Sequence, residues 1–360
     1  MRSYWSIALM VAAGMAAAVL IGFYPMLSQA PAAYDDEQEG FDTQLVIKFS
    51  HVVAENTPKG LAAQEFARLV KEKTNDRVKV EVYPNGVLYS EVDEIDALQQ
   101  GSVQMIAPSF PNLSELLPSW MALDLPFAFP TNEAVQEAFQ GEIGSTLFGQ
   151  LERINMVGMA FWGNGFKQLT SNIGPIVHPS DLRGQHFRTM RSKLLDAEFR
   201  LFDMRTTEMP FNQVYRNLEN GTVDGGENSI SNIYTKKFYQ VQKYLTISNH
   251  GYLGYAVLMN RTFWKKLPAD IQQQIQEAME ETTEWANQNA ILMNQKQLEE
   301  IRNESRIQIY TLSPEERKEW MNAWEPIYTQ YESYIGTELI KKIRKLQQKY
   351  SEYAPAPAAS

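Results

Sequence analysis

A helical pattern with no breaker runs from Pro268 to about Glu304 in this chain. Roughly 35 residues with a rise of about 1.5 Å each form a rod about 50 Å long. Because that length exceeds the width of one small domain, we expect the helix to span two domains. The chain length of 360 residues agrees with this expectation, since such a chain usually divides into more than one hydrophobic core.

Short extended segments alternate with amphipathic helices before this long helix. The first series predicts strand, helix, strand, helix and strand at 45–50, 58–73, 78–83, 91–100 and 103–107. The second series predicts the same order at 185–190, 192–203, 204–209, 211–220 and 222–227. This alternation is typical of open, mostly parallel sheets with helices on their faces. We therefore predict an α/β fold with two open-sheet domains.

The N-terminus has the composition of a secretory signal peptide, because Arg2 precedes an apolar run that ends near Tyr24 and small residues follow. The run, at about 20 residues, is also long enough to serve as an uncleaved membrane anchor. Either alternative places the folded part outside the cytoplasmic membrane. No second apolar run of spanning length follows, so the chain is not itself a channel or permease. We assign 1–33 to this signal peptide or anchor, 34–43 to a linker and 351–360 to a disordered tail.

Composition argues against several classes of function. A formal net charge of −10 without a long basic tract argues against nucleic-acid binding. Cysteine is absent, and the four histidines at 51, 178, 186 and 250 lack metal-ligand spacing, so we predict no metal site. A lone Gly-x-Gly at 163–165 follows a predicted strand. It indicates a domain crossing or a close backbone approach, since no third glycine opens a helix to bind a dinucleotide cofactor.

Polar side chains gather where the predicted strands end. In open α/β sheets, ligands bind beyond the carboxyl ends of the strands. The candidate binding residues in such places are His51, Glu55, Lys59, Ser109, Trp162, Lys167, Arg188 and Asn228. A planar guanidinium matches a carboxylate with two parallel hydrogen bonds, and an asparagine amide can donate to the same oxygens. A lysine in the first turn of a helix suits a second anionic group. The pattern predicts a cleft for a small organic anion.

These residues also have structural explanations, and an enzyme stays open as an alternative. The arginine fits an ion pair at a strand end, the two lysines fit solvated positions, the histidine fits a loop and the asparagine fits a turn. The chain contains no Gly-x-Ser-x-Gly, no His-Glu-x-x-His and no P-loop. A hydrolase or lyase would have to use a carboxylate such as Glu55, Glu208 or Glu227.

Several segments together carry a specific combination of motifs. Leu182-Arg183-Gly184 is followed by Phe187-Arg188, and then by Gly221-Thr-Val-Asp-Gly-Gly-Glu-Asn228. The further matching segments are Ser50–Gly60, Phe161–Gln168, Ser248–Ala256 and Phe263–Asp270. In this combination the chain resembles the solute-binding proteins of TRAP (tripartite ATP-independent periplasmic) transporters, the DctP family. The resemblance covers about residues 44–345.

The resemblance implies two α/β domains, joined by hinge strands and a long helix, that close on an organic acid. It implies that Arg188 binds the ligand carboxylate and that Asn228 is its companion. Lys167, where many members have a second arginine, resembles the C4-dicarboxylate subgroup. The family's partners are a small and a large integral-membrane permease subunit, with a sodium gradient driving uptake, and the binding protein performs no chemistry.

This resemblance also sets the predicted organisation. The first domain comprises 44–164 plus 254–293, and the second comprises 165–253 plus 294–350. We expect an exported, periplasmic monomer that captures succinate, malate or fumarate without a cofactor. Gly225-Gly226 and Arg191 depart from the commoner residues of the subgroup. A ligand sensor for a membrane receptor stays open as a second alternative.

Overall fold

The structure, a computed structural model, describes residues 44–351 together with Met10 and Gly14. The predicted signal peptide or anchor, apart from those two positions, lies outside the described residues, as do the linker up to residue 43 and the tail beyond Ser351. Within the part that the structure describes, no helix is both long and apolar enough to cross a membrane.

A nine-stranded sheet runs through the described chain in the order β2-β1-β3-β8-β4-β7-β5-β6, and β9 pairs with β8. Its strands are β1 (Leu45–Ser50), β2 (Val78–Tyr83), β3 (Met105–Ile106), β4 (Met156–Ser171), β5 (His186–Thr189), β6 (Arg205–Glu208), β7 (Gly225–Ser229), β8 (Tyr244–Asn260) and β9 (Gln308–Thr311). The β1–β3, β5–β6 and β5–β7 pairs are parallel, as the alternation of strands and helices predicts. The α/β fold class is confirmed.

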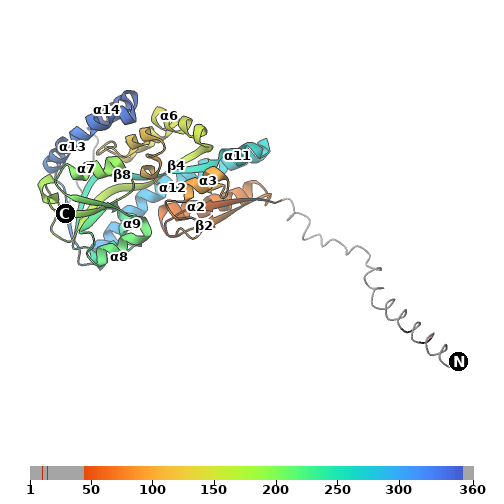
Figure 1. Cartoon of the computed structure of the whole chain (residues 1–360), viewed down its shortest axis with the longest axis horizontal. Helices are drawn as coiled ribbons and strands as arrows, with labels where there is room; N and C mark the ends of the chain where they lie inside the picture. Colours follow the sequence, from red (N-terminus) through yellow and green to blue (C-terminus); the bar gives the residue numbers. More distant parts are fainter. Residues whose placement is uncertain (1–9, 11–13, 15–43, 352–360) are drawn as a thin grey trace, which may run out of the picture. The chain divides into compact units, whose positions relative to one another are not determined.

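The long strands β4 and β8 join two halves of this sheet. β4 has 16 residues and β8 has 17, and they pair antiparallel along their length. At one end of this pair β3 joins β8, whereas at the other end β7 joins β4 and β9 joins β8. We call the half with β1, β2 and β3 the first lobe, and the half with β5, β6, β7 and β9 the second lobe. Figure 1 shows β4 and β8 passing between them.

Glycines interrupt the pairing of these strands between the lobes. The register of β4 against β8 shifts at three places, one of them between Gly163 and Gly165. A Cβ on Gly163 would lie 2.3 Å from Tyr252 Oη, and Gly165 has a φ of +135°. The close approach expected at these glycines is therefore present, and the domain crossing stays a prediction. The strand continues through the glycines as a bulge, although the sequence suggested that it ends before them.

Helices surround both halves of the sheet. The α-helices are α2 (Pro58–Lys73), α3 (Glu94–Gln100), α4 (Phe110–Leu113), α5 (Asn132–Gln140), α6 (Glu142–Leu151), α7 (Lys193–Arg200), α8 (Val214–Glu219), α9 (Ile230–Thr235), α10 (Phe238–Val241), α11 (Arg261–Lys266), α12 (Ala269–Glu304), α13 (Pro314–Ile335) and α14 (Thr337–Tyr350). The 3-10 helices are η2 (Pro118–Leu123), η3 (Glu152–Ile154), η4 (Pro179–Leu182) and η5 (Phe211–Gln213). α2 begins where its sequence predicts, because the Thr57 side chain accepts from Gly60 N and proline occupies the first turn.

The 36-residue helix α12 spans both lobes, as its length predicts. It packs against α2 of the first lobe, against β4 and against α9 of the second lobe. Two asparagines on α12 bind the crossing backbone of β4: Gly163 N donates to Asn287 Oδ1 at 2.7 Å, and Asn294 Nδ2 donates to Asn164 O at 2.6 Å. Asn294 Oδ1 also accepts from Ser231 N at 2.9 Å, which ties α9 to the same helix.

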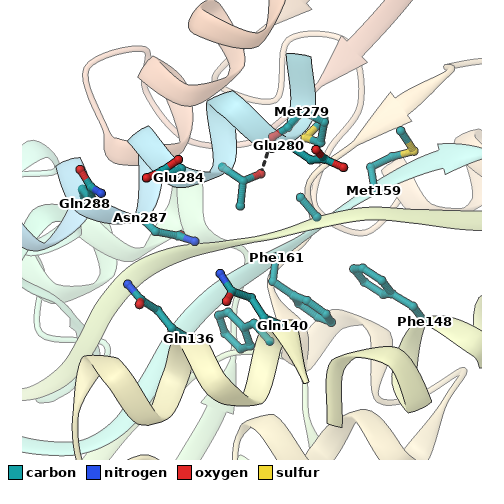
Figure 2. A pocket seen from close by; sticks show the side chains of 13 residues that line it. Gln136, Gln140, Phe148, Met159, Phe161, Met279, Glu280, Glu284, Asn287 and Gln288 are labelled. Carbon is teal, nitrogen blue, oxygen red and sulfur yellow. Dashed lines mark hydrogen bonds between the residues drawn. The ribbon is translucent and has the colours of Figure 1, made fainter. Parts of the chain in front are cut away.

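Aromatic side chains form much of the core beside β4. Phe161 stacks on Phe148 of α6 with ring centroids 4.1 Å apart, and on Phe139 of α5 at 4.9 Å. The same rings form one side of a surface groove that α12 borders (Figure 2). This packing fixes the start of β4 and therefore the path of the strand between the lobes.

Candidate ligand-binding site

A small cavity of about 20 Å³ lies where the strands of both lobes end. Its lining residues follow β1 (Val52, Val53, Lys59), β2 (Glu91), β3 (Ser109), β5 (Arg188, Met190), β6 (Phe211) and β7 (Asn228, Asn232), with Leu253 and Tyr255 from β8. The cavity thus occupies the place where open α/β sheets bind ligands. A molecule bound in it would contact both lobes at once.

Arg188 is a buried cation without an acidic partner in the described part of the chain. Its side chain is 2% exposed, and its Nε and Nη2 both donate to Met209 O, at 2.9 and 2.7 Å. A guanidinium has five N–H groups, so those that do not bind Met209 stay available to a ligand. Burial lowers the pKa of Arg188, while Glu91 and Glu227 oppose that shift, and the group stays charged at neutral pH.

Lys59 supplies the second cation of the cavity. It lies in the first turn of α2, is 1% exposed, and donates from Nζ to Ala107 O at 2.8 Å. The ammonium also lies 3.8 Å from the centre of the Tyr255 ring. Burial lowers the pKa of Lys59 to about 8, and the carboxylates of Glu94 and Glu91 oppose that shift.

Neutral hydrogen-bonding groups complete the lining. Asn228 Oδ1 accepts from Asn232 Nδ2 at 2.8 Å and from Ser229 N at 3.1 Å, which orients the Asn228 amide. The Ser109 hydroxyl accepts from Asn112 Nδ2 at 3.1 Å, so its own proton can be donated elsewhere. Both side chains are suited to hold carboxylate oxygens beside the two cations.

Glu91 connects the two lobes across the cavity. Its Oε1 accepts from Asn112 Nδ2 at 2.9 Å in the first lobe, and its Oε2 accepts from Phe211 N at 3.1 Å in the second lobe. The carboxylate therefore fixes the spacing between the lobes beside Lys59. It also partly balances the positive charge of the two buried cations.

Four of the sequence-predicted site residues do not line the cavity, namely His51, Glu55, Trp162 and Lys167. His51 is fully buried beside Phe49, and burial together with the nearby Lys59 lowers its pKa to about 3, so it is neutral. Glu55 is exposed in the loop before α2. Trp162 is fully buried and donates from Nε1 to Thr283 Oγ1 at 3.0 Å, which anchors β4 to α12.

Lys167 lies in a separate buried cluster of ionisable groups. Its Nζ donates to Glu227 Oε1 at 2.9 Å and lies 3.9 Å from Asp124 Oδ1. Glu227 Oε2 hydrogen-bonds His250 Nε2 at 2.7 Å, and His250 Nδ1 hydrogen-bonds the Ser248 hydroxyl at 2.7 Å. Although burial alone raises the pKa of Glu227, Lys167 and His250 lower it to about 2. The structure therefore gives Lys167 a carboxylate partner from the protein itself.

Sequence reasoning missed Glu91, Asn232 and Tyr255. Asn232 lies four residues after Asn228, a spacing that brings side chains together on a helix, but the short helix α9 was not predicted. Tyr255 lies two residues after Leu253 on the same face of β8. Glu91 follows β2 at some distance, and no local pattern distinguishes it from a solvated acid.

The matching family model describes a bacterial extracellular solute-binding protein, family 7 (DctP), and it covers residues 49–334. The C4-dicarboxylate-binding protein DctB of Bacillus subtilis is 50% identical over 347 residues, which are 96% of this chain and 99% of that protein. Both the family model and this relative extend over nearly all of the described chain.

Two solved structures show the same architecture. A TRAP periplasmic solute-binding protein from Sulfurospirillum deleyianum with bound succinate has a TM-score of 0.81 and 41% identity, covering 84% of this chain and 99% of that one. A TRAP periplasmic solute-binding protein from Pseudomonas aeruginosa with bound L-malate has a TM-score of 0.77 and 34% identity, covering 80% and 100%. Together with the family model and the relative that is 50% identical, these structures show that this chain belongs to the DctP family of bacterial extracellular solute-binding proteins.

Proposed function

We propose that this chain is the substrate-binding subunit of a TRAP transporter and that its ligand is a C4-dicarboxylate such as succinate, malate or fumarate. The observation that carries the proposal is Arg188, a buried guanidinium that the described chain leaves without an acidic partner. A buried charge is costly unless it is paired, so the site favours an anionic ligand. The ligands of the relative and of the two solved structures described above, a C4-dicarboxylate, succinate and L-malate, are of this chemical class.

Lys59 is the better candidate for the second carboxylate of the ligand. It lines the same cavity as Arg188 and approaches it from the other lobe, whereas Lys167 is already paired with Glu227. A ligand held between Arg188 and Lys59 would contact both lobes, with the Asn228 amide and the Ser109 hydroxyl donating beside the two cations. His51, Glu55 and Trp162 have no direct role in this proposal.

The expected energies allow micromolar affinity. A C4 diacid has about eight non-hydrogen atoms, which at about 1.5 kcal/mol per atom sets a ceiling near 12 kcal/mol. Micromolar binding requires about 8 kcal/mol. Charge-assisted hydrogen bonds contribute about 1.5–3 kcal/mol each, so three or four of them suffice after the entropy of closure is subtracted.

Delivery, partners and location complete the proposal. The captured acid passes to a small and a large integral-membrane permease subunit, and the chain works outside the cytoplasmic membrane as a monomer without a cofactor. The periplasm stays our prediction for its compartment, with the N-terminal segment as a signal peptide or anchor. The division into 44–164 plus 254–293 and 165–253 plus 294–350 also stays a prediction.

The test is calorimetric titration of succinate into the native chain and into Arg188→Ala. We expect micromolar affinity in the native chain and no measurable binding in the variant, because a desolvated carboxylate would lose its guanidinium. Arg191→Ala is the matched control, since Arg191 pairs with Glu115 at the surface and does not line the cavity. Micromolar affinity in Arg188→Ala would overturn the assignment of the site.

A further inference from the structure

A second and larger hollow lies on the surface where α13 and α14 meet the second-lobe end of β8. Its volume of about 550 Å³ is within the range of pockets that bind small molecules. It shares no lining residue with the cavity around Arg188. We call it the cationic groove and define it by Phe127, Leu312, Arg317, Lys318, Met321 and Arg344.

The charge of this groove is opposite in sign to that of the whole chain. Three of its described lining residues are basic, and none of its described lining residues is Asp or Glu. The chain as a whole has a formal net charge of −10. A surface hollow that is lined by charges of one sign concentrates ions of the opposite sign, so this groove favours an anion.

Arg317 is the least compensated cation of the groove. Within the described residues its guanidinium has neither an ion pair nor a hydrogen bond, and it lies 5.2 Å from the centre of the Phe127 ring. Burial is the only cause that lowers its pKa, so no carboxylate is close enough to offset the shift. The guanidinium stays charged at neutral pH and has all its N–H groups available to an anion.

Arg344 and Lys318 add positive charge to the same groove. The Arg344 guanidinium stacks 3.7 Å over the Tyr328 ring and pairs with Glu325, which holds it in one orientation. Lys318 follows Arg317 on α13 and is exposed, and no carboxylate in the described chain pairs with it. An anion in the groove would therefore be within the field of three positive groups.

The remaining lining of the groove combines apolar residues, among them Phe127, Leu312 and Met321, with polar ones such as Asn249 and Gln347. Phe127 and Leu312 present buried side chains, and Met321 is 43% exposed although it lies beside them. An inorganic anion would leave the exposed part of Met321 in contact with water. A ligand with an apolar body would cover that surface, at about 25 cal/mol per Å² removed from water.

The groove in Figure 2 shows that these properties are specific. That groove has a similar volume, about 490 Å³, and also has aromatic walls, from Phe148 and Phe161. Its border on α12, however, carries Glu280 and Glu284, as Figure 2 shows. An anion would be repelled there, so size and apolar walls alone do not select the cationic groove.

We propose that the cationic groove is a second ligand site, which binds an organic anion with one carboxylate on an aromatic body. The carboxylate pairs with Arg317, and the aromatic body lies against Phe127, Leu312 and Met321. This site is separate from the dicarboxylate cavity, and the proposal does not depend on the identity of the ligand bound there.

The test is titration of 4-phenylbutyrate into the full chain saturated with succinate, so that the probe cannot occupy the cavity around Arg188. The probe is titrated into Arg188→Ala without succinate as well, where we expect the same affinity. Loss of one charge-assisted contact corresponds to a factor of about ten or more, so Arg317→Gln should weaken the probe at least tenfold. The neutral 4-phenylbutanamide should bind the native chain at least tenfold more weakly than the acid.

The controls separate this site from general effects of mutation. Arg302→Gln removes an arginine of α12 that pairs with Glu299, and it should leave probe affinity unchanged. Arg317→Gln should keep the native succinate affinity and melting temperature, which shows that it is folded. The NMR signal of the Met321 methyl group should shift with probe concentration in the native chain and stay fixed in Arg317→Gln.

Three outcomes would overturn the proposal. One is equal affinity for the acid and its amide, and another is an unchanged probe affinity in Arg317→Gln. The third is binding of the probe only to a chain shortened after Ser351, which lines the groove. In that case the C-terminal residues 352–360, and not a small anion, are the natural occupants.

Discussion

Lys59 and Glu94 are two buried groups whose ionisation determines the charge of the dicarboxylate cavity. Burial lowers the pKa of Lys59 to about 8 and raises the pKa of Glu94 to about 8, and Glu91 also faces Lys59. Above pH 8, either Lys59 loses a proton or Glu94 gains a negative charge. Both changes lower the net charge of the site by one, although the site has to hold an anion.

We predict that succinate affinity falls in alkaline solution. A bound carboxylate raises the pKa of Lys59 above its value in the free protein. Its contribution is therefore fully present below pH 8 and is lost as pH rises further, by up to about tenfold per pH unit. Calorimetry between pH 6.5 and 9.5 measures this change. Lys59→Met should bind succinate weakly, and its affinity should change less with pH than that of the native chain. The affinity of Glu94→Gln should also fall less steeply with pH than that of the native chain. A dissociation constant that is constant to pH 9.5 in the native chain would contradict the role of Lys59.

Asp124 belongs to the buried cluster around Lys167, and its ionisation should affect stability. Neither of its oxygens has a hydrogen bond within the described residues, and Lys167, Glu227, Glu198 and His250 face it or its partners. Burial raises the pKa of Asp124 to about 7. Because the folded pKa lies above the unfolded one, the stabilising contribution of the protonated group is lost as pH rises from about 4 through 7.

Asp124→Asn should therefore remove a pH-dependent loss of stability. Relative to the native chain, the free energy of unfolding of the variant should rise between about pH 4 and 7, by up to about 1.4 kcal/mol per pH unit, and level off above pH 7. Urea unfolding at several pH values gives the difference. Asp96→Asn, at an exposed position of α3, is the control and should show no such trend. A difference that stays constant with pH would mean that Asp124 is ionised throughout this range.

At the scale of single elements, the turn before α2 positions Lys59. Gly60 is the third residue of that helix, and a Cβ there would lie 2.3 Å from Ala54 O and 2.5 Å from Glu55 O. Both contacts are with backbone, which cannot move without displacing the loop that follows β1. The glycine is therefore required by a close approach of two chain segments.

We predict that Gly60→Ala lowers both stability and ligand affinity. Displacement of the loop should cost about 1–3 kcal/mol of unfolding free energy, as overpacking commonly does. Movement of Lys59 should raise the dissociation constant for succinate. Gly149→Ala on α6 is the control, because nothing lies within 4 Å of its added Cβ. Helix propensity predicts that this control is stabilised by about 0.5–1 kcal/mol. Equal melting temperatures for the two variants would contradict the prediction.

Elements with strong local signals could be predicted from the sequence. Thr57-Pro58 and the capping box at Ser313 mark the starts of α2 and α13, and an uninterrupted pattern marks α12. The short helices α4, α9, α10 and α11 were missed, because four to six residues carry little periodicity and tertiary packing decides their place. The sequence also could not show that β4 and β8 continue through their glycines.

The candidate site was predictable only in part, for a related reason. Position after a strand identified Arg188, Asn228, Lys59 and Ser109, which do line the cavity. The same rule does not distinguish a free lysine from a paired one. Whether Lys167 is paired depends on Glu227, which lies on the neighbouring strand and is 60 residues away in sequence.

At the scale of the whole molecule, Asn294 of α12 connects helix α9 of the second lobe to the strand β4 that passes between the lobes. It accepts from Ser231 N and donates to Asn164 O, and both partner residues are fully buried. We predict that Asn294→Leu lowers the free energy of unfolding by roughly 2–4 kcal/mol, because two buried backbone groups lose their partner. Chemical denaturation measures the loss. Asn289→Leu on the same helix, whose side chain donates to Met293 Sδ, should change stability by less than about 1 kcal/mol. Similar losses in the two variants would contradict the role of the two Asn294 hydrogen bonds.

The described chain passes between the lobes three times, through β4, β8 and α12. Consequently no contiguous stretch of the gene encodes either lobe. A fragment that ends near Gly163 lacks the β8 strand that completes the sheet of the first lobe, and the remaining fragment carries that strand without its neighbour β3. Expressed alone, each fragment would expose unpaired strand edges. Expressed together, the two fragments should reassemble. Because the ligand binds only the assembled protein, the extent of reassembly should increase with ligand concentration.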